Sequence, residues 1–186
     1  MIPIIHRVNT IKQLNTIDIK HGVEVDIRCY KNRLVLNHDP FGKGDVFESY
    51  LKNYNHNLLI LNIKESGIEE LTIEITKKYL KNREFFLLDV EIPFVVSQDG
   101  KYKKYISTRY SEYESFQSLK NFDNLSNWVW IDTFSKLPKL NNEIIDFLKT
   151  KKTCLVSPSR WGREKELTNY IDKFKEFNYQ PDYVMN

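Results

Sequence analysis

Nine apolar runs of strand length alternate along this sequence with amphipathic stretches, and this alternation restricts the possible folds more than any other feature. The runs cover residues 2–5, 22–30, 33–37, 57–64, 85–94, 104–108, 128–134, 153–157 and 182–185. Most of them are continuously apolar, which is typical of strands buried on both faces in a parallel sheet that helices cover. The sequence therefore indicates the α/β class.

Helix-like stretches separate most of these runs. They cover residues 9–20, 45–55, 66–82, 111–122, 141–151 and 163–177. The clearest one, 66–82, brings Ile68, Leu71 and Ile75 to one side of a helix. Asn9 and Ser66 are expected to cap the helices that they precede.

The number of strands predicts the architecture. If residues 33–37 form a hairpin extension of 22–30, or only an extended loop, eight main strands remain. Eight parallel strands with helical crossovers make a compact (β/α)8 barrel of the TIM type, and a doubly wound open sheet is the alternative. We expect one barrel domain over residues 1–186.

The chain is short for such a barrel, which typically takes about 250 residues. We therefore expect some crossover helices to be shortened or missing. Only about ten residues separate the runs at 85–94 and 104–108, and no helix follows 182–185. The flank between the first and last strands would then be uncovered, so self-association into a homo-oligomer is expected.

Charge and hydropathy exclude some classes of protein. The net charge of +3 is no signature of nucleic-acid binding, and it fits an anionic small ligand better than a cationic one. No apolar run approaches the roughly 20 residues of a membrane helix, and the N-terminal segment is too short for a signal peptide. We expect a cytoplasmic protein without membrane insertion. Cys29 and Cys154 lie in apolar runs and are expected to be buried thiols.

Polar side chains gather where the predicted strands end. In a barrel these positions face the mouth, where active sites lie. They are His6, Arg7, Glu24, Asp26, His38, Asp39, Asn62, Lys64, Asp89, Glu91, Arg109, Asp132 and Arg160.

Glu24 and Asp26 form the most informative pair among them. Residues two apart on a strand face the same way, so the two carboxylates lie side by side. They repel each other unless a cation or a proton lies between them. Oxygen ligands of this kind suit Mg²⁺ or Ca²⁺. The alternative is an exposed edge strand whose acids are solvated.

Two histidines and two cations flank this pair in the sequence. His6 and His38 fit an acid/base pair across a ligand, because imidazole titrates near neutral pH. Alternatively, both are ordinary polar side chains at strand ends. Arg7 and Lys64 would supply fixed positive charge to an anion, although Arg7 could equally pair with one of the acids.

The segment "SPSRWGR", residues 157–163, is a further candidate for binding. Arg160 and Arg163 could hold an anionic group of a substrate, with Trp161 stacking on a sugar or a base. In the alternative interpretation the segment is a strand-to-helix turn in which Arg163 opens the last helix.

Three segments together resemble the glycerophosphodiester phosphodiesterase family, within the wider group of PI-phospholipase-C-like barrels. They are "IIHR", "GVEVDIRCYKNRLVLNHD" and "LNIK". The family pattern is an opening His-Arg, a Gly-x-x-Glu-x-Asp strand, a His-Asp about a dozen residues later, and an acid-x-Lys at the end of the third strand. The match covers roughly the first third of the chain.

The resemblance implies metal-dependent hydrolysis of a phosphodiester, such as a glycerophosphodiester, with one histidine as general base and the other as general acid. It assigns catalysis to His6 and His38, metal binding to Glu24, Asp26 and the Asn62 position, and phosphate binding to Arg7 and Lys64. Apart from the resemblance, Arg160 and Trp161 of the segment 157–163 would bind the rest of the substrate.

The chain departs from the family pattern at two places. Val8 stands where the family has Gly, and Asn62 stands where it has an acid, which removes one negative charge from the metal site. The alternatives are therefore a weakened or inactive barrel that binds a phosphorylated ligand, a phospholipase-like lyase with Phe41 and Trp161 near its mouth, and an unrelated barrel.

Overall fold

The computed structural model describes residues 1–186 and divides them into two compact units. The N-terminal unit is Ile4–Ser97, and the C-terminal unit is Gln98–Asn186 together with Met1–Pro3. The expectation of one domain over the whole chain stays a prediction.

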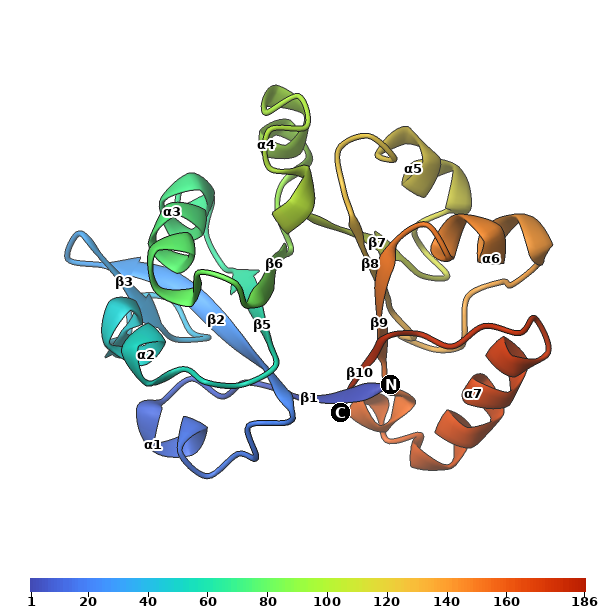
Figure 1. The fold of residues 1–186 in the computed structure, drawn as a ribbon, viewed down its shortest axis with the longest axis horizontal. Coiled ribbons are helices and arrows are strands. Elements are labelled where there is room, and N and C mark those ends of the chain that lie inside the picture. Colours follow the sequence, from blue (N-terminus) through green and yellow to red (C-terminus); the bar gives the residue numbers. More distant parts are fainter. The chain divides into compact units, whose positions relative to one another are not determined.

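The N-terminal unit alternates strands and helices as expected (Figure 1). Its elements are β1 (Ile2–Ile5, of which the last two residues belong here), α1 (Ile11–Leu14), β2 (Gly22–Tyr30), β3 (Arg33–Leu36), β4 (Asp45–Val46), α2 (Phe47–Asn53), β5 (Leu58–Ile63), α3 (Glu69–Leu80), β6 (Glu84–Leu88) and α4 (Ile92–Ser97).

Strand β2 is the centre of this unit. It pairs in parallel with β1 and β5, in a register that places Asp26 opposite Asn62, and β5 pairs in parallel with β6. Its second half also pairs antiparallel with β3, through a tight turn in which Lys31 and Asn32 have positive φ. The hairpin extension that the sequence left open is therefore confirmed.

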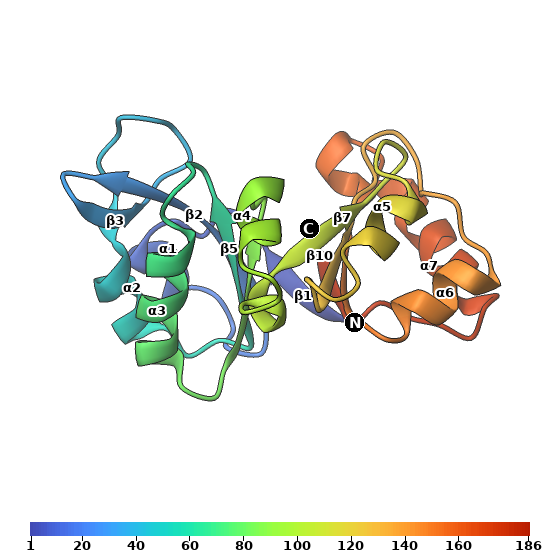
Figure 2. The same ribbon diagram turned by 90° about the horizontal axis from the view of Figure 1, so that it is seen from above.

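Burial follows the apolar runs. Every residue of β5 is buried, which confirms the expectation of strands covered on both faces. Helices α2 and α3 pack against each other and lie on one side of β5 and β6 (Figures 1 and 2).

The strand expected over 85–94 is too long and is corrected by the structure. β6 ends at Leu88 because Asp89 has a φ of 58°, a left-handed conformation that a strand does not continue through. Ile92–Ser97 then forms α4. Pro93 suits the first turn of a helix, where a missing N–H costs nothing, and does not suit a central strand.

The helices are shorter than the sequence predicts, and both expected caps are wrong. Thr10, not Asn9, caps α1, in a reciprocal box with Gln13. Helix α3 begins at Glu69 without a side-chain cap, because Gly67 turns the chain with a φ of 91° and donates its N–H to the Glu69 side chain.

The C-terminal unit repeats the alternation. Its elements are η1 (Lys103–Tyr105), β7 (Ser107–Tyr110), α5 (Phe116–Asn121), β8 (Trp128–Ile131), α6 (Asn142–Leu148), β9 (Lys152–Val156), η2 (Pro158–Trp161), η3 (Glu164–Glu166), α7 (Leu167–Lys175) and β10 (Tyr183–Met185). The strand expected at 104–108 starts later, because a turn of 3₁₀ helix occupies Lys103–Tyr105.

Four parallel strands organise this unit, in the order β7, β8, β9 and β10. Helices α5, α6 and α7 lie along one side of them (Figures 1 and 2). Between strands and helices lies a core of Tyr110, Leu119, Val129, Ile131, Ile144, Ile145, Leu148, Leu155 and Phe174. With β1, β2, β5 and β6, the parallel strands number eight, as expected.

The two cysteines differ in exposure. Cys154 is buried, as expected, and its burial raises the pKa of the thiol. Cys29 is exposed, contrary to expectation, because β2 pairs with β5 only as far as Ile27 and then continues with β3 alone. No helix in the structure is long and apolar enough to cross a membrane.

Candidate functional site

The acidic pair on β2 is buried. Glu24 and Asp26 are 1% and 0% exposed and lie on the same face of the strand, as the spacing predicts. Because β2 is paired on both sides, the alternative of an edge strand with solvated acids is excluded. Two carboxylates in such a place need compensating charge or protons.

Hydrogen bonds hold Glu24 at both oxygens. Its Oε2 accepts from the main-chain N–H of Arg7 over 2.9 Å, and its Oε1 accepts from Nδ2 of Asn62 over 3.0 Å. His6 Nε2 lies 3.7 Å from the same Oε2. Burial, and then the negative charge of Asp26, raise the pKa of Glu24 to about 7 despite these donors.

Asp26 is held by a residue that the sequence interpretation assigned elsewhere. Asn9 donates to Oδ2 over 2.7 Å and accepts from the Asp26 main-chain N–H over 2.8 Å. The Thr10-x-x-Gln13 capping box was the signal that Asn9 is not the cap and is available for another role. Lys64 Nζ lies 3.3 Å from Oδ1 of Asp26.

His38 lies in a chain of contacts that fixes its tautomer. Its Nε2 is 2.6 Å from Nη2 of Arg7, and its Nδ1 is 2.9 Å from Oδ1 of Asp39. A guanidinium can only donate, so Nε2 must accept and Nδ1 carries the proton. The hydrogen bond from His38 lowers the pKa of Asp39. Arg28 Nε donates to the main-chain carbonyl of His38 over 3.1 Å.

The basic side chains of Arg7 and Lys64 both lie beside Asp26. Arg7 Nε lies 4.0 Å from Asp26 Oδ2, so Arg7 contacts the acidic pair as well as His38. Lys64 Nζ also lies 4.0 Å from Asp89 Oδ2. The structure thus brings together His6, Arg7, Glu24, Asp26, His38, Asn62 and Lys64, all within the N-terminal unit.

Two buried oxygens in this group suit a hard cation. Asp26 Oδ1 and Asn62 Oδ1 are inaccessible to solvent, and their residues are direct neighbours across β2 and β5. Asn62 Oδ1 accepts no hydrogen bond, and Asp26 Oδ1 has only the ion pair with Lys64. With Glu24 they offer two carboxylates and an amide oxygen, a donor set that fits Mg²⁺ or Ca²⁺. No group of three His, Cys, Asp or Glu residues is placed to bind a metal ion, because the third position is an amide.

Arg160 and Trp161 lie in the C-terminal unit, in η2. Trp161 is 41% exposed, and its ring lies 5.4 Å from that of Phe134, which lies 5.9 Å from that of Tyr113. Arg163 is engaged elsewhere: it donates to Glu166 and to the Tyr170 hydroxyl. Its alternative role at the start of the last helix is the one that these contacts support.

Solved structures decide the fold. A glycerophosphoryl diester phosphodiesterase from Parabacteroides distasonis matches 99% of this chain and 81% of its own with a TM-score of 0.62 at 13% identity. A glycerophosphodiester phosphodiesterase from Thermotoga maritima matches 100% of this chain and 93% of its own, with a TM-score of 0.61 at 18% identity. The chain has the glycerophosphodiester phosphodiesterase fold. No family model and no curated protein matches its sequence.

A third structure with this fold is an Oleispira antarctica phosphodiesterase in complex with the product sn-glycerol-3-phosphate. It matches 100% of this chain and 92% of its own, with a TM-score of 0.61 at 18% identity. The glycerophosphodiester phosphodiesterase fold is a (β/α)8 barrel of the TIM type. The fold class predicted from the sequence is therefore confirmed, in preference to a doubly wound open sheet.

Proposed function

We propose that the chain, as a single barrel domain, hydrolyses a phosphodiester of the glycerophosphodiester class with a divalent cation and two histidines. The observation that carries this proposal is the placement of Arg7. Its main-chain N–H binds Glu24, and its guanidinium contacts His38 and lies beside Asp26. One residue thus joins the acidic pair to a histidine, and the shared fold supports the class of reaction.

Glu24, Asp26 and Asn62 would hold the cation, Mg²⁺ or Ca²⁺. When bound, it would stabilise negative charge on the phosphate oxygens. The buried Asn62 Oδ1, which accepts no hydrogen bond, supports this assignment, as does the raised pKa of Glu24.

The histidines divide the proton transfers between them. His38 accepts a proton from the attacking hydroxyl at Nε2, the nitrogen that carries none in the resting tautomer. His6, whose Nε2 lies 3.7 Å from Oε2 of Glu24, gives a proton to the leaving oxygen. The products are an alcohol and a phosphomonoester, reached directly or through a cyclic phosphate.

Positive side chains bind the phosphate. Arg7 and Lys64 surround Asp26 in the resting protein and turn toward an anion when one enters. Arg160 and Trp161 bind the rest of the substrate. The exposed ring of Trp161, beside Phe134 and Tyr113, supports stacking on a flat or ring-shaped group.

A second candidate is a barrel that binds a phosphoester without cleaving it. Asn62 favours this second candidate. Its amide donates to Glu24 at a position where a third carboxylate would bind a cation more strongly. The Lys64 ammonium beside Asp26 already compensates part of the negative charge.

Hydrolysis of a panel of glycerophosphodiesters and an aryl diester, with Mg²⁺ or Ca²⁺ and after chelation, tests both candidates. We expect cation-dependent turnover that His6→Ala and His38→Ala each abolish, while His21→Ala, a histidine outside the site, retains it. Binding of glycerol 3-phosphate without turnover of any diester would instead establish the second candidate. Full activity in both site variants would reject the assignment of the histidines.

A further inference from the structure

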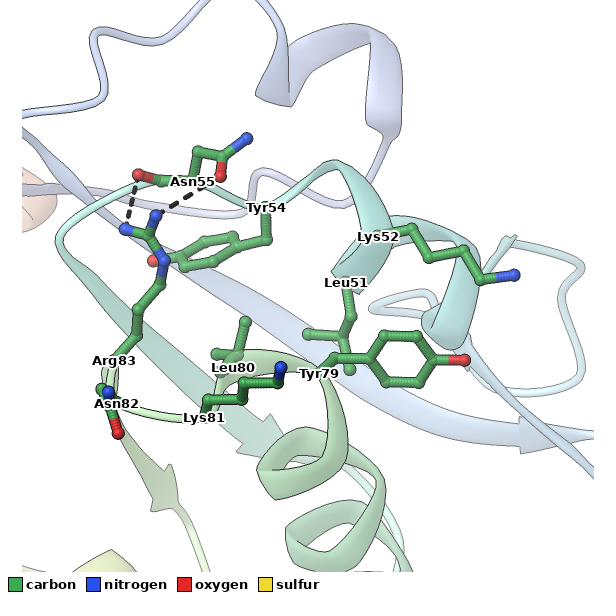
Figure 3. Close-up of a pocket in the computed structure, with 9 residues that line it drawn as sticks. All are labelled: Leu51, Lys52, Tyr54, Asn55, Tyr79, Leu80, Lys81, Asn82 and Arg83. Atoms are coloured by element: carbon green, nitrogen blue, oxygen red, sulfur yellow. Dashed lines mark hydrogen bonds between the residues drawn. The ribbon is translucent and has the colours of Figure 1, made fainter.

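A pocket of about 690 Å³ opens in the N-terminal unit, and none of the candidate catalytic residues lines it (Figure 3). Leu51, Lys52 and Asn55 line it from the end of α2 and the loop that follows. Tyr79, Lys81 and Arg83 line it from the end of α3 and the loop to β6. Its volume suits a small organic molecule.

The pocket lies at the opposite end of the strands from the candidate catalytic site. Its two loops lead into the first residues of β5 and β6, Leu58 and Glu84, whereas Asn62 and Asp89 lie at or just beyond the last residues of these strands. Six residues at a rise of about 3.3 Å each separate the two ends of β5 by more than 15 Å. A ligand in this pocket would not contact Asn62 or Lys64.

The charges around the pocket have one sign. Lys52, Lys81 and Arg83 line it, and no Asp or Glu does. Neither Lys52 nor Lys81 takes part in an ion pair, unlike Lys64 and Lys77 of the same unit. A concave site with three cations and no carboxylate attracts anions.

Hydrogen bonds hold the Arg83 guanidinium in one position. Its Nη1 donates to the Asn55 carbonyl over 2.8 Å, and its Nη2 donates to Oδ1 of Asn55 over 3.3 Å (Figure 3). Nη1 also donates to the His56 carbonyl over 3.2 Å. A guanidinium has five N–H groups, so these three bonds leave two. The planar group is thus fixed in place with donors remaining for a ligand.

The ends of α2 and α3 offer a simpler reason for the cations, because lysines near helix C-termini interact favourably with the exposed carbonyls. Several of these carbonyls, however, already accept N–H groups. The Leu51 carbonyl accepts from the main-chain N–H of Tyr54, and the Leu80 carbonyl accepts from that of Arg83. The Arg83 guanidinium donates to the carbonyls of Asn55 and His56. The helix ends therefore leave the positive charge of the two lysines largely uncompensated.

Lys81 also occupies a strained backbone conformation. Its φ and ψ are 42° and −86°, in the half of the map that glycine occupies at little cost. Backbone strain of this kind is concentrated at functional sites. The chain thus places a lysine at the pocket where glycine would fit the backbone better.

We propose that this pocket binds a phosphorylated small molecule, independently of the proposed hydrolysis. Lys81 and Arg83 hold the phosphate, and Lys52, whose ammonium group points away from Arg83 (Figure 3), adds positive charge at the rim. Tyr79 and Leu51 pack against the apolar or ring-shaped part of the ligand, which the volume accommodates. The site is a second anion site on the far side of the N-terminal unit.

Site-resolved NMR titration of the full chain tests this proposal. AMP is the probe, with adenosine and inorganic phosphate as comparison ligands. We expect saturable shifts at the amides of Asn55 and residues 81–83, weaker binding of the comparison ligands, and at least a tenfold loss of AMP affinity in Lys81→Gly. This variant removes the charge and relieves the strain, so it retains the fold. Lys173→Gln, the same loss of charge on α7, should bind AMP as the parent does.

Two results would overturn the proposal. One is a set of AMP-dependent shifts confined to the candidate catalytic site around Arg7 and Lys64. The other is a weak, non-saturating response at 81–83 that Lys81→Gly leaves unchanged, as general attraction to a basic surface would give. Because the readout separates the two ends of the strands, either result leaves the hydrolysis to its own test.

Discussion

The side-chain amide of Asn62 donates to Glu24, although the residue directly opposite Asn62 in the sheet is Asp26. The amide nitrogen thus faces one acid of the pair and leaves its Oδ1 buried and without a donor. This arrangement compensates part of the charge of Glu24 without a cation, and it makes Asn62 the residue that sets how much negative charge the site carries.

Asn62→Asp is expected to strengthen cation binding. A third carboxylate replaces the amide, so Mg²⁺ or Ca²⁺ affinity should rise at least tenfold, which corresponds to about 1.4 kcal/mol. Calorimetric titration of the cation into chelator-treated protein measures the change. Asn57→Asp, the same substitution at an exposed position, is the control. Equal affinities in parent and Asn62→Asp would show that the cation does not bind at this position.

The stability of the cation-free protein should fall with rising pH. Burial and the charge of Asp26 raise the pKa of Glu24 from 4.5 to about 7, so the folded state holds this proton more tightly than the unfolded state does. The corresponding stabilisation is full below pH 4.5 and is lost as the pH rises through 7. The loss is on the order of 3 kcal/mol.

Urea denaturation with a chelator at several pH values measures this effect. Glu24→Gln should flatten the decline between about pH 4.5 and 7.5, whereas Glu48→Gln, on the exposed side of α2, should retain it. A parent protein whose free energy of unfolding is constant over this range would contradict the prediction.

Asn9→Ala should destabilise the fold by about 1–3 kcal/mol, because it leaves the buried Oδ2 and main-chain N–H of Asp26 without their partner. Chemical denaturation gives the difference in free energy of unfolding. Asn15→Ala changes the same residue type at an exposed position and should cost much less. Equal effects of the two substitutions would mean that the Asn9 contacts contribute nothing beyond ordinary surface polarity.

Phe41→Gly should stabilise the protein or leave it unchanged, unlike most losses of an aromatic side chain. Phe41 is 96% exposed and has a φ of 62°, so glycine relieves strain of about 1 kcal/mol while losing almost no burial. Phe41→Ala keeps the strain and removes the ring. A glycine variant less stable than the alanine variant, by thermal or urea unfolding, would refute this explanation.

The sequence was enough to predict that Glu24 and Asp26 share a face, because successive side chains of a strand point to opposite faces whatever surrounds the strand. The pairing of Arg33–Leu36 was one of two possibilities that the sequence left open, and the structure shows the hairpin. Glycine is not needed there, since Lys31 and Asn32 adopt the positive φ of the turn.

Features that depend on contacts between residues far apart in the chain could not be predicted from the sequence. The end of β6 is set by the backbone of Asp89, which no apolar pattern reveals. Asn9 binds Asp26, 17 residues away, and the Thr10–Gln13 capping box shows only that Asn9 is not the cap, without indicating this partner. Asn62 was identified as a departure from the family pattern, but its bond to Glu24 required the register of β2 and β5.

Strand β1 has consequences for the order in which the chain can fold during synthesis. Ile4 and Ile5 pair with β2, which follows within about 20 residues, whereas Ile2 donates its N–H to the carbonyl of Asp182. On the ribosome, Ile4–Ser97 is complete before strands β7 to β10 of the C-terminal unit have been made. Ile2 must wait for Asp182, so the C-terminal unit closes only after β7, β8 and β9 have been synthesised.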